Sequence, residues 1–176
     1  LLERLPPRVS GFADVAPVVG ENRSIARLGL ERIRTAPRPG IAALLAAARV
    51  SPADVTLETI AFALAPRLNA AGRVGEAEDA VALLLADDAP TAAAAAAALE
   101  AANVTRRDAT RTALDEARAA LGDGPGDDPA ILVRGAWPVG VVGLVAARLA
   151  EEHGRPAVVG AELDGVLRAS CRAPDG

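Results

Sequence analysis

The first half of the chain carries apolar residues at helical spacing. Between residues 25 and 33 an apolar side chain recurs every few positions, with arginine and glutamate on the other faces, which predicts an amphipathic helix that covers a core. Further helices are predicted over 41–48, 56–65 and 76–86, separated by turns that contain proline or glycine. This half is therefore expected to be mainly helical.

A long helix is predicted next. The segment from Asp87 to Thr91 has the composition of a helix start, and the residues after it can remain helical as far as Leu121. A helix of about thirty residues would be roughly 45 Å long. Its apolar positions are mostly alanine, so it can bury little surface by itself and is predicted to connect two lobes.

The pattern changes after a Gly/Asp/Pro-rich linker at 122–129, which is predicted to be the domain boundary. The elements expected beyond it are a buried strand at 130–133, a helix at 140–152, a strand at 156–159 and a third strand at 163–169. Strand, helix and strand in succession indicate the beginning of an α/β domain with a parallel pair of strands.

The segment 64–73 is predicted to be a loop between two helices, because Pro66 cannot continue a helix and Gly72 permits a turn. Arginine and asparagine side chains donate planar hydrogen bonds of the kind that hold a phosphate or a carboxylate. The candidate anion ligands in this segment are Arg67, Asn69 and Arg73. The alternative is structural, with both arginines solvated or bonded to helix carbonyls.

Two further polar patterns have both a binding and a structural interpretation. Asn103, Arg107 and Arg111 are spaced four apart and form a polar stripe on the long helix, which is either a contact surface or a solvated face. Gly140 and Gly143 lie at a predicted helix start, where they either expose backbone amides to a phosphate or allow close helix packing.

Composition limits the function classes. The chain has 51% hydrophobic residues, a net charge of -4 and nineteen basic residues, all of them arginine, so any nucleic-acid binding must depend on local patches. No apolar run is long enough to span a membrane, and no signal peptide opens the chain. The single Cys171 fits a reducing cytosol. The chain contains no methionine, and we expect it to be an interior fragment of a cytoplasmic protein.

The segment from Phe62 to Arg73 resembles a signature of the RecJ-type single-stranded-DNA exonucleases, members of the DHH phosphoesterase superfamily. Four further segments match in family order, at 13–17, 20–23, 27–30 and 140–143. The resemblance implies the helical end of a DHH catalytic domain over 1–50, a helical connector over 51–121, the linker at 122–129 and the start of a DHH-associated domain over 130–176.

The family's activity is implied together with its ligands. The resemblance implies 5′ to 3′ exonuclease activity on single-stranded DNA in repair and recombination, with two-metal hydrolysis by Mn²⁺ or Mg²⁺. Asp14 would then bind metal, although its spacing alone favours a turn or N-cap role. The candidate DNA contacts are Arg67, Asn69, Arg73, Arg107, Ser170 and Arg172.

The chain departs from the family pattern at two places. Pro138 stands where a histidine is usual after the tryptophan, and Cys171 replaces a glycine between the serine and arginine of a Gly-Ser-Gly-Arg-Ser segment. Two alternatives therefore remain, a non-catalytic nucleic-acid-binding protein on the same scaffold and a phosphodiesterase for short oligonucleotides. We expect a monomer with no membrane partner, and no nuclease activity from this fragment alone.

Overall fold

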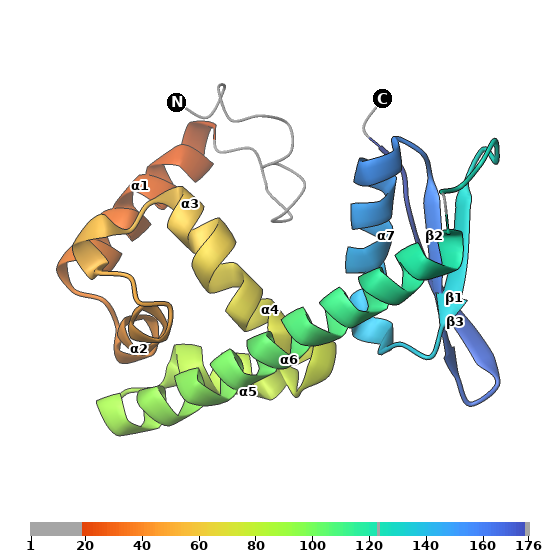
Figure 1. The fold of residues 1–176 in the computed structure, drawn as a ribbon. Helices are drawn as coiled ribbons and strands as arrows, with labels where there is room; N and C mark the ends of the chain where they lie inside the picture. The colour runs from red at the N-terminus through yellow and green to blue at the C-terminus, as the bar shows by residue number, and fades with distance from the viewer. Residues whose placement is uncertain (1–18, 123, 175–176) are drawn as a thin grey trace. The chain divides into compact units, whose positions relative to one another are not determined.

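The computed structural model describes residues 19–122 and 124–174 (Figure 1). Their contacts separate into two compact units, and each is described by itself. The first unit extends to Asn103 but leaves out Gly72–Gly75, which belong to the second unit together with the residues from Val104 onward. No described helix is long and apolar enough to cross a membrane.

The first unit is built from helices around a leucine-rich core. Its elements are α1 (Gly20–Thr35), α2 (Pro39–Ala47), the 3-10 helix η3 (Pro52–Asp54), α3 (Leu57–Thr59), the π-helix η4 (Ile60–Leu64), most of α4 (Ala65–Val74), α5 (Ala77–Leu85) and the first part of α6 (Ala89–Leu121). Leu44, Leu83 and Leu99 are fully buried in this core. A Cβ atom at Gly40 would lie 1.9 Å from the carbonyl oxygen of Leu83, so only glycine lets α2 approach α5 this closely.

The predicted amphipathic helix is present as α1, but its apolar face is only partly used. Leu30 and Ile33 pack against the leucine core. Ile25 and Leu28, in the preceding turns, are 67% and 57% exposed. The expectation that this face covers a core is therefore correct for its second half and wrong for its first half.

The predicted loop at 64–73 is wrong, because the chain is helical from Leu57 to Val74. In a regular α-helix the ring of Pro66 would meet the carbonyl four residues before it. Here the π-helix η4 precedes the proline, and the N–H of Ala65 bonds to the carbonyl of Ile60, five residues back. The wider turn accommodates the ring. Gly72 has a helical backbone and needs no positive φ.

The second unit contains the rest of α6 and a small α/β layer, which confirms the predicted α/β class. Its further elements are β1 (Ile131–Gly135), α7 (Val139–His153), β2 (Ala157–Leu163) and β3 (Val166–Arg172). The sheet order is β1-β2-β3, with β1 parallel to β2 as predicted and β3 antiparallel to β2.

Helix α7 covers one face of this sheet and supplies the largest share of the second core. Val141, Val145 and Leu149 are completely buried against strand residues such as Val159. The prediction of a buried first strand is correct for one face only, because burial alternates along β1 and Leu132 is 73% exposed.

The alanine-rich second part of α6 packs into the core of the second unit. Ala113 and Ala117 are buried in the same cluster as the core residues of α7. The division between the two units falls between Asn103 and Val104, inside α6, rather than in the linker at 122–129. Small side chains allow this close packing, which a count of large apolar residues does not reveal.

Candidate nucleic-acid interface

The start of α7 lies against the backbone of Arg73. A Cβ atom at Gly140 would be only 2.0 Å from the carbonyl oxygen of Arg73. The Nη1 atom of Arg73 in turn donates a hydrogen bond of 3.1 Å to the carbonyl oxygen of Gly140. Of the two interpretations of Gly140, close packing is therefore the one that its surroundings require, and this packing holds a guanidinium beside the first turn of α7.

One turn further along α7, Gly143 faces the end of β3. A Cβ atom at Gly143 would lie 3.2 Å from Oγ of Ser170 and 3.6 Å from Nη2 of Arg172. Arg172 donates from Nη1 to Oγ of Ser170, at 3.2 Å, and to the carbonyl oxygen of Cys171, at 2.8 Å. Since Ser170 pairs with Val159 in the sheet register, it shares the face that α7 covers. The hydroxyl and the second guanidinium therefore lie beside the early turns of α7.

Arg106 of α6 brings a further positive charge near Arg73, and Arg107 lies next to Arg106. The pKa of Arg106 is lowered from its usual value, first by burial and then by the neighbouring charges of Arg73 and Arg107. Arg107 itself is exposed. Like charges held close together repel one another, and an anion between them relieves the repulsion. We call Arg73, Arg106, Arg107, Ser170, Arg172 and the first two turns of α7 the arginine cluster.

The backbone of α7 adds hydrogen-bond donors to the arginine cluster. Most N–H groups in the first turn of a helix lack partners within the helix, and the helix dipole makes that end favourable for an anion. In α7 the N–H of Val141 already bonds to the carbonyl oxygen of Pro138, at 3.1 Å. The N-cap residue of α7 is Pro138, and no side chain caps the helix. Guanidinium, hydroxyl and backbone donors together are the groups that contact the sugar-phosphate backbone of nucleic acids.

Arg67 has a different environment from Arg73. Its Nε donates to Oε2 of Glu100, and its Nη1 donates at 2.6 Å to the carbonyl oxygen of Ala63 in the preceding turn. The side chain of Arg67 is only 15% exposed. Asn69 is exposed, and both residues belong to the first unit. Of the candidate DNA contacts, Arg73, Arg107, Ser170 and Arg172 belong to the second unit, and Arg67 and Asn69 do not.

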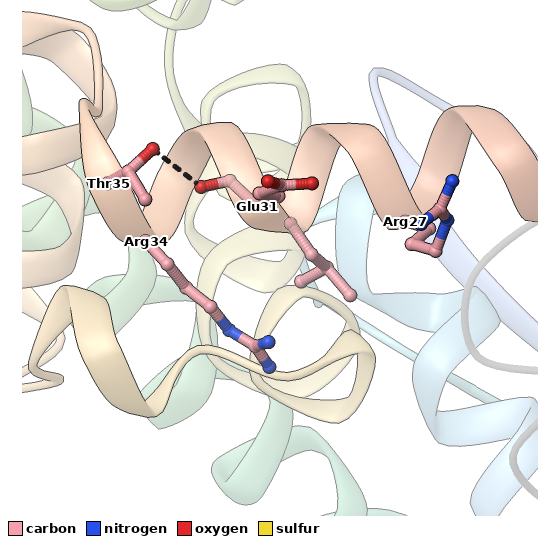
Figure 2. Close-up of a pocket in the computed structure, with 5 residues that line it drawn as sticks. Arg27, Glu31, Arg34 and Thr35 are labelled. Carbon is pink, nitrogen blue, oxygen red and sulfur yellow. Dashed lines mark hydrogen bonds between the residues drawn. The ribbon is translucent and has the colours of Figure 1, made fainter.

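A groove of about 300 Å³ lies along α1 (Figure 2). Arg27, Glu31 and Arg34 line it, among others. Arg34 already donates to the carbonyl oxygen of Val55 from Nε, at 2.9 Å, and from Nη2, at 2.6 Å. The carboxylate of Glu31 also lies between the two guanidinium groups along the helix (Figure 2). This groove is therefore less suited to an anion than the arginine cluster.

The candidate metal ligand Asp14 lies outside the described residues. Within 19–122 and 124–174, no three histidine, cysteine, aspartate or glutamate side chains come together in a way that could hold a metal ion. The described part of the chain thus does not fit a two-metal centre.

The sequence pattern alone did not single out Arg106. It stands beside Arg107 in the segment 103–107, which is similar to an Asn-x-x-Arg-Arg element of the RecJ-type exonucleases, but only Arg107 continued the spacing of four residues. An adjacent pair of arginines on a helix places one side chain toward the neighbouring element and one toward solvent. Here Arg106 is the inward member of the pair and Arg107 the exposed one.

Known proteins resemble the chain over most of its length. No known family profile matches it. It is 38% identical to the single-stranded-DNA-specific exonuclease RecJ of Bacillus subtilis, a match that covers 94% of this chain and 21% of that protein. The RecJ proteins of Thermus thermophilus and Escherichia coli are 39% and 36% identical over 91% and 93% of the chain, and 23% and 30% of their own lengths. The chain therefore spans less than a third of these curated relatives.

Solved structures agree with the sequence matches. A crystal structure of RecJ from Thermus thermophilus in complex with Mn²⁺ matches 91% of this chain and 25% of its own, with a TM-score of 0.75 and 35% identity. A crystal structure of exonuclease RecJ bound to manganese matches 99% of this chain and 45% of its own, with a TM-score of 0.78 and 33% identity. The predicted family resemblance is thus confirmed for sequence and fold.

Proposed function

We infer from these matches that the chain is a segment of a RecJ-type exonuclease, and we propose that it supplies part of the surface that holds single-stranded DNA. The observation that carries the proposal is the arginine cluster, in which Arg73, Ser170 and Arg172 surround the early turns of α7. All members of the cluster belong to one unit.

Each group in the arginine cluster has a defined part in binding. Arg73 presents positive charge from a fixed position, because its backbone packs on Gly140 and its guanidinium bonds to the same residue. Ser170 supplies a hydroxyl, and its Oγ orients Arg172. Arg107 adds charge from α6. Such groups contact phosphates rather than bases, so binding would be independent of sequence and would weaken with salt.

Hydrolysis itself is assigned to the whole protein rather than to the described residues. The matched RecJ structures contain Mn²⁺ or Mg²⁺. A divalent pair activates water and stabilises the leaving oxygen when it is bound. We propose the same metals for the protein that contains this chain, with Asp14 as one candidate ligand, and a role in DNA repair and recombination in the cytoplasm, acting as a monomer.

Salt-dependent binding tests the proposal. The 176-residue chain is titrated with a fluorescein-labelled oligothymidine strand over a series of salt concentrations, beside an Arg172→Ala variant. The variant should bind more weakly at low salt, and its slope of log affinity against log salt should be smaller by roughly 0.7. A slope equal to that of the wild type, at equal folding, would remove the arginine cluster from the DNA-binding surface.

Affinities measured for oligothymidine strands of several lengths distinguish a surface for long single-stranded DNA from the alternative, a phosphodiesterase for short oligonucleotides. A phosphate-binding surface gains affinity as the strand grows until the surface is filled. If dinucleotides bind as well as long strands, the short-oligonucleotide phosphodiesterase is the better assignment.

A further inference from the structure

Trp137 lies two positions before Val139, the first residue of α7. It is only 8% exposed, and its Nε1 atom donates a hydrogen bond of 2.7 Å to Oε2 of Glu116 on α6. The indole ring lies on Gly135, where a Cβ atom would come within 2.5 Å of Cε2. The ring also joins the buried cluster that contains Ala113 and Ala117 of α6. The position of Trp137 is thus fixed by contacts on several sides.

The position of Trp137 determines how the chain enters α7. The next residue, Pro138, is the N-cap, and its φ of -58 is fixed by its ring. Two residues later, Gly140 packs so closely on the backbone of Arg73 that a Cβ atom would not fit between them. A shift of the indole would therefore be transmitted to the turn of α7 on which the arginine cluster is built.

Other contacts besides the hydrogen bond between Trp137 and Glu116 hold α6 and α7 together. At the far end of α7, Arg118 of α6 bonds to Glu152 from Nε at 3.2 Å and from Nη2 at 2.5 Å. Alanines of α6 also pack in the common core. The Trp137–Glu116 bond is a polar link between α6 and the residues just before α7, where a small displacement matters to a bound phosphate.

We propose that Trp137, held by Glu116, is a positioning residue for the arginine cluster. It does not contact the DNA backbone itself. It keeps the first turn of α7 against Arg73, so that this guanidinium and the start of the helix hold a fixed position for phosphate contacts. This inference rests on the proposed function, since it needs the arginine cluster to bind DNA.

Charge and geometry make opposite predictions for Glu116. Removing a carboxylate near a basic site should tighten binding to a polyanion if only charge matters. If the carboxylate acts by holding Trp137, its removal should weaken binding instead. Glu116→Gln separates the two effects, because the amide oxygen still accepts from the indole N–H while the charge is lost.

Two substitutions remove the link by different routes. Trp137→Phe keeps an aromatic ring over Gly135 but removes the donor. Glu116→Asp keeps the charge and shortens the side chain, so that the carboxylate no longer reaches the indole. Each should weaken binding to the labelled oligothymidine strand about three- to tenfold, the range expected for one lost hydrogen bond. Glu116→Gln should bind as tightly as wild type or more tightly.

Glu152→Asp is the matched control. It is the same charge-preserving change on the other link between α6 and α7, and it should lower the melting temperature without weakening binding. Equal weakening by Glu152→Asp and Glu116→Asp would overturn the inference, because general loosening would then explain both. Wild-type affinity in both Trp137→Phe and Glu116→Asp would overturn it as well.

Arg73→Ala in the same assay keeps the two proposals distinguishable. If Arg73→Ala and Arg172→Ala both bind like wild type, the proposed function itself fails. If those arginine variants bind weakly while Trp137→Phe and Glu116→Asp bind normally, the proposed function stands and only the positioning role of Trp137 is wrong.

Discussion

Arg67 and Arg73 lie six residues apart on the same helix, α4, but their surroundings differ in kind. Arg67 is largely buried and ion-paired with Glu100. Arg73 is exposed, bonds to a carbonyl rather than a carboxylate, and lies near enough to Arg106 for the two charges to interact. Charge in the first environment is neutralised within the protein, whereas charge in the second is available to an external anion.

The comparison shows that an arginine in a family-like segment is not by itself evidence of a ligand contact. A guanidinium that is already paired with a carboxylate binds an external anion more weakly, because the existing ion pair must first be broken. A guanidinium among like charges gains when an anion arrives. The neighbours of the side chain, rather than its position in the motif, therefore decide which arginine is the better candidate for a DNA contact.

The largest expected effect comes from Gly140, which sets the position of Arg73. Gly140→Ala places a methyl group where the Arg73 carbonyl oxygen already lies. We expect a loss of about 3 kcal/mol in the free energy of unfolding, because backbone must move on both sides. DNA affinity should fall with it. Chemical denaturation measures the first effect and the oligothymidine titration the second.

Gly72→Ala is the matched control for Gly140→Ala. A Cβ atom at Gly72 has nothing within 4 Å, and the backbone there is helical. Alanine should therefore stabilise the helix by about 0.5–1 kcal/mol. Equal destabilisation by the two substitutions would show that Gly140 does not pack closely on the backbone of Arg73.

Arg67→Ala should mainly affect stability. It leaves Glu100 without its partner in a half-buried position, so we expect a loss of about 1–2 kcal/mol. Its salt slope for DNA binding should equal that of the wild type. Arg111→Ala, which breaks an exposed pair with Asp108, should cost about 0.5 kcal/mol or less. A reduced salt slope for Arg67→Ala would instead make Arg67 a DNA contact.

Arg73→Ala should change the salt dependence of DNA binding and leave stability nearly unchanged, the reverse of Arg67→Ala. The exposed side chain fills no core volume, so the free energy of unfolding should change by about 0.5 kcal/mol or less. The slope of log affinity against log salt should decrease by roughly 0.7, because one phosphate contact is lost. A fall in melting temperature with an unchanged slope would place Arg73 in the same class as Arg67.

The smallest effect concerns the other end of α7. The pKa of Glu152 is lowered, first by its hydrogen bond with Arg118 and then by the charges of Arg118 and Arg148. A carboxyl whose pKa is lower in the folded state contributes stability above its unfolded value of 4.5, and this stability is lost as the pH falls through the folded value. Glu152→Gln should thus lower the melting temperature slightly at pH 7.

The difference between wild type and Glu152→Gln should shrink as the pH falls below about 4.5, where the carboxyl is progressively protonated. Thermal unfolding at a series of pH values measures it. A difference that is constant with pH would mean that the side chain stabilises α7 by packing rather than by charge.

Periodicity and composition determined the elements of this chain well. The 33-residue helix α6 was predicted from its alanine-rich sequence and its start near Asp88, whose Oδ1 accepts from the N–H of Thr91 at 2.8 Å. The strand, helix and strand of the second unit were likewise visible as apolar runs separated by glycine and proline. These signals are local, because each depends on residues within a few turns of one another.

Tertiary structure decided the remaining points. The sequence around Pro66 predicts a break, and only the π-helix before it allows the chain to continue as a helix. The sequence shows Arg67 and Arg73 as equivalent, but Glu100 lies thirty-three positions from the first and Gly140 sixty-seven from the second. Partners so distant along the chain are chosen by the packing of the whole unit, so no local pattern can identify them.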